Sequence, residues 1–212
     1  MFEDVPSLSV LPFFSIAASL YRLPKGKKTF FTKDYLLPSS AAYTGEKENT
    51  SIYAAWTDDK LLFHFEIKGS FEKADSEFRK GDSIELFIDT RDIKSRRFMT
   101  SFCHHFVIFP EKVDGFFIKE VTRFRTDDVH ALASSKDIAV TAGRSKSSCI
   151  IDAEFPHDVL HGYNPQEFNR LGFTYKINYQ DKETQNFAFS SLEYLPENNP
   201  QMWGTLHLSE SS

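Results

Sequence analysis

Apolar and polar residues alternate in short segments over most of the chain from residue 51 onward. In residues 61–67 (LLFHFEI) and 83–89 (SIELFID), every second side chain is apolar, which is the period of a strand with one buried face. We expect Pro110 to end the strand at 102–109, because proline cannot donate a hydrogen bond to a sheet. The same criteria predict further strands at 28–32, 51–56, 115–121, 138–142, 148–155, 170–179, 185–189 and 203–208, and a short helix near 156–160.

These short strands predict an all-β fold, a two-sheet antiparallel β-sandwich (immunoglobulin-like or jelly-roll-like) with few short helices. Phenylalanine supports this class, because the chain has 22 Phe residues and aromatic side chains favour pleated, half-buried surfaces. No fixed repeat and no linker of Gly, Ser or Pro divides the sequence. We therefore expect a single domain over residues 1–212, with residues 1–35 wrapping its edge.

Charge and the N-terminal pattern narrow the classes of function. The formal net charge of −5 argues against a nucleic-acid surface, and no apolar run is long enough to insert in a membrane. Acidic residues (Glu3, Asp4) begin the chain and Pro12 interrupts the first apolar run, so we expect no signal peptide and a cytoplasmic protein. The two cysteines, Cys103 and Cys149, do not make a disulfide framework, and we expect buried or free thiols.

Five segments carry a family pattern when they are taken in order. They are YAAWTDDKLLFHFEI (53–67), GDSIELFIDTRD (81–92), IIDAEFPHDVL (150–160), RLGFTYKINYQDKE (170–183) and MWGTLHL (202–208). Together they resemble the family-9 carbohydrate-binding modules and the wider DOMON-like group of β-sandwiches, over roughly residues 51–208. The chain departs from the pattern at Tyr179, where the family has an aspartate after the asparagine.

The resemblance implies a non-catalytic binding module whose favoured ligand is carbohydrate. Members that bind a sugar hold it between two tryptophans, and this chain has two, Trp56 and Trp203. Both lie in strand motifs that the group shares for packing, so core packing is the alternative role. The DOMON-like branch also contains haem- and metal-binding sandwiches, which are the second functional reading.

The segment CHHFVIFP, residues 103–110, carries the most reactive side chains. Neighbours on a strand point to opposite faces, so we expect His104 in the core and Cys103 with His105 as a surface-facing polar pair. Cys103 and His105 also have the spacing for two ligands of a zinc ion, with Asp89 or Asp92 as a third. We expect the strand at 83–89 to pair with this strand and to place Glu85, Phe87 and Asp89 on the same face as that pair.

The strand end at 89–92 (Asp-Thr-Arg-Asp) supports two interpretations. Arg91 with Asp89 and Asp92 has the chemistry to orient a hydroxylated ligand through bidentate bonds, and an Asp turn closed by an ion pair gives the same pattern. Acidic turns at 58–59 and 181–183 offer oxygen ligands for calcium, although solvated turns are commoner. None of the familiar catalytic motifs is present, so we expect no enzyme activity.

The sequence therefore predicts a non-catalytic binding module, with carbohydrate as the favoured ligand. The alternatives are a haem- or metal-binding sandwich and a protein-interaction module without a small ligand. We assign no catalytic residue, no metal ligand and no cofactor, and we expect no nucleic acid, no membrane insertion and either a sugar or a protein partner. The expected ligand-binding residues are Trp56, Asp89, Arg91, Asp92, His105 and Trp203.

Overall fold

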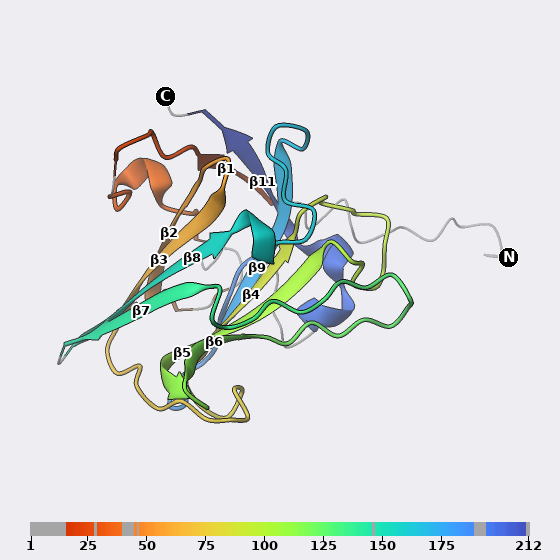
Figure 1. Cartoon of the computed structure of the whole chain (residues 1–212). Helices are drawn as coiled ribbons and strands as arrows, with labels where there is room; N and C mark the ends of the chain where they lie inside the picture. The colour runs from red at the N-terminus through yellow and green to blue at the C-terminus, as the bar shows by residue number, and fades with distance from the viewer. Residues whose placement is uncertain are drawn as a thin grey trace, which may run out of the picture.

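Two β-sheets stacked face to face form the protein, as the computed structural model shows (Figure 1). The structure describes residues 16–27, 29–39, 45, 47–145, 147–188 and 194–210. In the larger sheet the strand order is β1 (Ala17–Tyr21), β11 (Gly204–Ser209), β9 (Arg170–Asn178), β4 (Ser83–Asp89), β5 (Cys103–Val113) and β6 (Phe116–Glu120), with β10 (Gln185–Asn186) pairing to β9. In the smaller sheet the order is β2 (Thr50–Trp56), β3 (Lys60–Lys68), β8 (Ser148–Pro156) and β7 (Ala139–Arg144).

The predicted all-β sandwich with few short helices is confirmed. The helical elements of the described residues are four short 3-10 turns, namely η2 (Lys33–Tyr35), η3 (His157–Val159), η4 (Pro196–Asn198) and η5 (Pro200–Met202). No helix within these residues has the length and apolar character needed to cross a membrane. Among the strands that the structure describes, all the pairs are antiparallel except one, since β1 runs parallel to β11 at the edge of the larger sheet.

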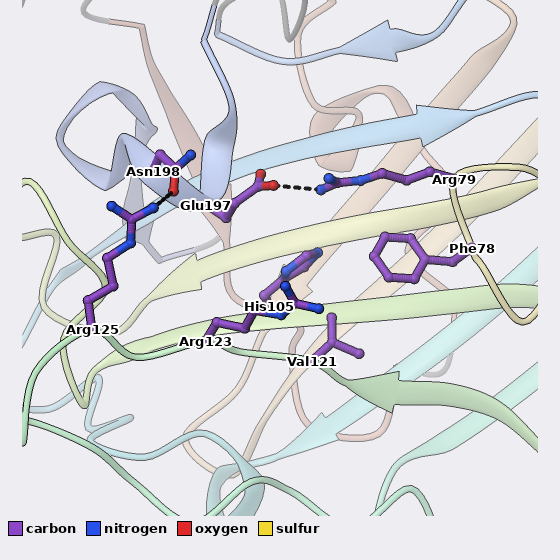
Figure 2. A pocket seen from close by; sticks show the side chains of 8 residues that line it. All are labelled: Phe78, Arg79, His105, Val121, Arg123, Arg125, Glu197 and Asn198. Atoms are coloured by element: carbon purple, nitrogen blue, oxygen red, sulfur yellow. Dashed lines mark hydrogen bonds and ion pairs between the residues drawn. The ribbon is translucent and has the colours of Figure 1, made fainter.

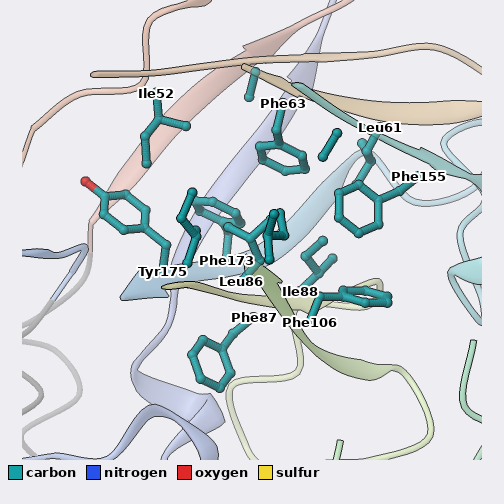
Figure 3. Close-up of a cluster of buried hydrophobic side chains, with 14 of the residues drawn as sticks. Ile52, Leu61, Phe63, Leu86, Phe87, Ile88, Phe106, Phe155, Phe173 and Tyr175 are labelled. Carbon is teal, nitrogen blue, oxygen red and sulfur yellow. The ribbon is translucent and has the colours of Figure 1, made fainter. Parts of the chain in front are cut away.

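The core lies between the sheets because each strand turns one apolar row inward. Phe63 of β3 stacks on Phe173 of β9 with the ring centroids 5.7 Å apart, so the two layers interlock directly (Figure 3). Ile84, Leu86 and Ile88 of β4 are 0% exposed in the same cluster, as the alternation predicts. Every residue of β4 is buried on both faces, which shows that the outer face of this strand is covered as well.

Two strand predictions are wrong, each for a local reason. Residues 29–32 form no strand, because Phe30 is buried in a small cluster with Tyr35, Ala55 and Leu62 rather than in a ladder. Strand β5 continues through Pro110 to Val113. Its register against β6 shifts between Ile108 and Val113, and such an irregularity tolerates a residue without an N–H group. The predicted return strand at 185–189 is described as far as residue 188 and forms only the short β10.

Candidate functional site

A pocket of about 290 Å³ opens on the outer face of the larger sheet, the face turned away from the smaller sheet (Figure 2). Its residues come from strand β5, the loop before β4, the chain after β6, and η4. We call it the arginine pocket, because three of its lining side chains are arginines. The lining residues are Phe78, Arg79, His105, Val121, Arg123, Arg125, Glu197 and Asn198.

A buried carboxylate supports the floor of the arginine pocket. The Glu85 side chain is 0% exposed and accepts both Arg79 Nε (3.1 Å, at Oε1) and Arg79 Nη2 (2.8 Å, at Oε2). His105 Nε2 lies 3.0 Å from Glu85 Oε2, and Asn178 Nδ2 donates to Oε1 at 2.9 Å. The network draws on β4, β5 and β9, whose register places these side chains on one face. Its groups are thereby fixed in orientation before any ligand binds.

The charges of this network stabilise one another. Burial alone would raise the pKa of Glu85, but hydrogen bonds from His105 and Arg79 outweigh it and lower the pKa to about 2. Burial opposes the charge of Arg79, yet the Glu85 carboxylate raises the pKa of this guanidinium. Glu85 and Arg79 are therefore a doubly hydrogen-bonded ion pair at neutral pH, in which the carboxylate is buried and the guanidinium reaches solvent.

One wall of the pocket is the short turn η4, and Trp203 holds it in place. Trp203 is 2% exposed and its Nε1 donates to the carbonyl of Pro196 at 3.0 Å. Its ring packs on Phe87 (centroids 5.5 Å apart), and Phe87 stacks on His105 (4.1 Å). Through these contacts Trp203 fixes Glu197 and Asn198, which face the pocket. Glu197 accepts Arg79 Nη2 at 3.0 Å, so this wall is tied to the floor.

The rim of the pocket is basic. Arg123 and Arg125 are exposed and lie just after the end of β6. The chain remains attached to β5 at this point, because the Val121 N–H donates to the carbonyl of His105. Arg125 Nη2 donates to Asn198 Oδ1 at 2.5 Å, and the guanidinium lies 5.4 Å from the centroid of the Phe98 ring. Among the described residues, Arg123 has no carboxylate partner. Guanidinium donors thus face carboxylate and amide acceptors across one small cavity.

The predicted strand end at 89–92 forms a closed turn. Asp89 accepts the backbone N–H of Arg91 (2.9 Å) and of Ile93 (2.7 Å). Asp92, at a φ of 49°, accepts Thr205 Oγ1 at 2.9 Å and pairs with Lys94 at 2.6 Å. Gly172 of β9 pairs with Asp89 of β4. A Cβ atom at position 172 would lie only 3.0 Å from the Asp89 Cβ, so the close approach of the two strands favours glycine there.

The Arg91 side chain does not contact the carboxylates of that turn but packs on two aromatic rings. Its guanidinium carbon lies 3.6 Å from the centroid of the Phe168 ring and 4.6 Å from that of Phe102. Nη1 donates to the carbonyls of Thr90 and Gly162. Asp89, Arg91 and Asp92 thus have structural partners, and none of them lines the arginine pocket.

The two tryptophans lie in separate parts of the sandwich. Trp56, in the smaller sheet, is 4% exposed; its Nε1 donates to the carbonyl of Ser209 (3.1 Å), and Arg22 lies 4.9 Å from the ring centroid. Trp203 lies behind η4. Neither ring presents a free face to solvent, since both are buried, so the arrangement does not form a sugar clamp between two tryptophans.

The expected surface-facing pair is wrong, because Cys103 and His105 are 2% and 4% exposed. The strand pairing itself is confirmed: Asp89 lies opposite Cys103, and Phe87 lies opposite His105. Burial, together with the nearby Asp89 charge, raises the pKa of the Cys103 thiol to about 12. Both side chains are buried and His105 Nε2 is already engaged by Glu85, so the pair does not offer an open zinc site.

A second buried cluster joins His104, Glu120 and His130. Glu120 Oε1 lies 2.9 Å from both His104 Nδ1 and His130 Nε2 and also accepts Thr122 Oγ1, while Oε2 accepts the backbone N–H of Ala133. These three side chains are the group of possible metal ligands found in the described residues. Burial opposes the charge of Glu120, but the hydrogen bonds from His104 and His130 lower its pKa to about 2.

Both ring nitrogens of His130 already have partners within this second cluster. His130 Nδ1 lies 2.7 Å from the carbonyl oxygen of Ser101, and its Nε2 lies 2.9 Å from the Glu120 carboxylate. A metal ion would have to displace one of these contacts to bind the ring. The cluster is a buried hydrogen-bond network that fastens the loop over residues 121–135 to β5 and β6.

Sequence reasoning found one residue of the arginine pocket, His105, and missed the others. Phe78 and Arg79 lie in the mainly polar segment 70–80, which carries none of the motifs singled out above. Arg123 and Arg125 belong to the run Thr-Arg-Phe-Arg-Thr (122–126), whose two arginines at alternate positions are a detectable signal. Glu197 and Asn198 carry no pattern of their own, because only the docking of η4 by Trp203 brings them to the pocket.

Comparison with known families decides which group this sandwich belongs to. The family model described as "Carbohydrate family 9 binding domain-like" matches residues 28–211. The chain belongs to this family. The family resemblance of the five sequence segments is thereby confirmed. No curated protein sequence matches the chain.

Solved structures agree with this fold. A carbohydrate-binding module of family 9 from Caldicellulosiruptor kristjanssonii, in complex with cellotriose, superposes with a TM-score of 0.62 at 14% identity, covering 92% of this chain and 95% of that one. The glucose complex from the same organism gives a TM-score of 0.58 at 14% identity, covering 93% and 97%. A putative carbohydrate-binding protein from Bacteroides uniformis gives 0.56 at 11% identity, covering 92% and 99%.

Proposed function

We propose that the protein is a non-catalytic carbohydrate-binding module and that the arginine pocket is its sugar site. One observation carries the assignment to this pocket: in a sandwich of family 9, guanidinium donors, carboxylate and amide acceptors and an aromatic ring converge on a cavity of about 290 Å³. Small-molecule pockets measure roughly 300–1,000 Å³, so this volume suits one sugar ring. The complexes of family-9 modules with glucose and cellotriose support the ligand class.

The chemistry of the pocket matches that of a sugar. Arg123 and Arg125 supply donors to ring and hydroxyl oxygens, while Glu197 and Asn198 accept from hydroxyl hydrogens. Phe78 is half-buried and meets His105 edge to face, with the centroids 6.1 Å apart, so part of its ring remains for the apolar face of a sugar. The Glu85 network holds these groups in place, and both Glu85 and Glu197 bind Arg79.

Titration calorimetry tests this function directly. We expect glucose, cellotriose and a panel of other mono- and oligosaccharides to include at least one ligand with millimolar or tighter affinity. Phe78→Ala should weaken that ligand by about ten-fold, as loss of an aromatic contact predicts. Phe31→Ala is the matched control, since Phe31 is 42% exposed and stacks on His64 of the smaller sheet.

Three results would contradict the proposal. Absence of heat for every sugar, from protein that unfolds cooperatively, would favour a protein-interaction module instead. Release of new reducing ends from an oligosaccharide during prolonged incubation would show catalysis. Equal loss of affinity in Phe78→Ala and Phe31→Ala would place the sugar elsewhere.

A further inference from the structure

The arginine pocket is rich in positive charge, whereas the whole chain carries a net negative charge. The chain carries a formal net charge of −5, yet the pocket is lined by Arg79, Arg123 and Arg125 and by one acid, Glu197. From this excess of positive charge we propose that the pocket selects an acidic sugar, one that carries a carboxylate or a sulfate group. The inference rests on the proposed function and names the class of carbohydrate that the same site takes.

The carboxylates near the pocket do not neutralise its rim. Both acids are bound to a single arginine, Arg79, whose Nη2 lies 2.8 Å from Glu85 Oε2 and 3.0 Å from Glu197 Oε1. That one guanidinium therefore binds two carboxylates, so Arg79, Glu85 and Glu197 together carry a slight negative charge. The positive charges of Arg123 and Arg125 remain in excess.

The rim arginines lack acidic partners of their own. Arg125 donates to Asn198 Oδ1, which is a neutral amide, and packs on Phe98. Arg123 has no ion pair or hydrogen bond with the part of the chain that the structure describes. In Figure 2 the Arg123 side chain runs toward His105, across the middle of the pocket. A ligand lying on His105 and Val121 would meet this guanidinium first.

An oxyanion is the group that best completes this rim. A guanidinium binds a carboxylate or a sulfate through two parallel N–H bonds, which a hydroxyl group cannot match. The pocket encloses the ligand on several sides, so solvent screens the interaction less than on an open surface. Charge-assisted hydrogen bonds of this kind raise affinity by about ten-fold or more over a neutral ligand.

Matched pairs of sugars test the inference. Calorimetry on the full chain compares methyl glucoside with methyl glucuronide, methyl galactoside with methyl galacturonide, and glucose with glucose 6-sulfate. We expect the acidic member to bind at least about ten-fold more tightly in at least one pair, with an advantage that shrinks as salt is raised. The pair that shows it separates carboxylate from sulfate as the preferred anion.

Variants locate the effect. Arg123→Gln should abolish most of the acidic preference and keep the melting temperature, because Arg123 is exposed and pairs with no described acid. Arg170→Gln removes another exposed arginine, one that pairs with Asp92 outside the pocket, and should keep the preference. Retention of the preference in Arg123→Gln would overturn the assignment to this rim.

The remaining outcomes distinguish the two proposals. Neutral sugars that bind as tightly as their acidic partners would overturn the inference and leave the proposed function intact. Failure of both members of every pair, and of the wider sugar panel, would overturn the proposed function and the inference with it.

Discussion

The imidazole Nε2 of His105 lies 3.0 Å from the carboxylate Oε2 of Glu85, on the covered outer face of the larger sheet. Both side chains are nearly or completely buried, and Arg79 binds the same carboxylate from the pocket side. The contact joins strand β5 to the loop that carries Arg79, because one carboxylate oxygen contacts both the His105 imidazole and the Arg79 guanidinium. Changes at Glu85 should therefore affect stability and ligand binding together.

Replacing Glu85 by Gln should lower the free energy of unfolding by about 2 kcal/mol, because a neutral amide cannot accept the charge-assisted hydrogen bonds that the buried carboxylate accepts from Arg79. Sugar affinity should also fall, because Arg79 and Glu197 lose their fixed positions. Urea denaturation and calorimetry measure the two effects. Glu154→Gln breaks a half-exposed pair with Lys60 and should change stability by less than about 1 kcal/mol; equal effects at the two sites would contradict the prediction.

Stability should decline steeply in acid. The pKa values of Glu85 and Glu120 are lowered to about 2 from an ordinary value of 4.5, so the folded state holds these groups ionised more strongly than the unfolded chain does. Their contribution is fully present above pH 4.5 and is lost as the pH falls toward 2. Thermal melts from pH 7 to pH 2 follow the loss. In Glu120→Gln the melting temperature should start lower and depend less on pH over this range.

Leu86→Ala tests the core between the sheets. Leu86 is 0% exposed on the inward face of β4, and its truncation leaves a cavity that should cost about 2–5 kcal/mol. Ile150→Ala is the control, since Ile150 on β8 is 41% exposed and should change stability by less than about 1 kcal/mol. Chemical denaturation distinguishes the two, and a small effect at Leu86 would argue against this packing.

The two tryptophans should respond differently to substitution. Trp203→Phe removes the Nε1 bond to Pro196 and loosens η4, so sugar affinity should fall by about three- to ten-fold. Trp56→Phe removes the bond to Ser209 but lies outside the pocket, so affinity should hold while stability drops. Calorimetry and melting temperature report both. A larger loss of affinity in Trp56→Phe would place the sugar at that tryptophan, as the family resemblance first implied.

The His104–Glu120–His130 cluster should bind no metal, because its side chains already satisfy one another through hydrogen bonds. Elemental analysis after mild purification should find less than about a tenth of an equivalent of any transition metal, because a real site of this kind binds tightly enough to stay filled. Added zinc should leave the melting temperature unchanged. Stoichiometric zinc that is lost in His130→Asn would contradict this expectation.

The sequence by itself determined the class of fold. Alternation within β3, β4 and β9 marked the strands, because a strand between two layers must turn every second side chain toward the core. The motifs that resemble family 9 coincide with these strands. Even the pairing of β4 with β5 followed from the short connection between them.

Only the tertiary structure decided what covers the outer face of the larger sheet, and therefore where the site lies. Alternation places Cys103 and His105 on one face but is silent about whether a later segment packs over that face. Here η4, fixed by Trp203, and the loop carrying Phe78 cover it, so the expected surface pair is buried. The pocket assembles from segments as far apart as Arg79 and Glu197. Their meeting depends on long-range packing of irregular chain, which leaves no period in the sequence.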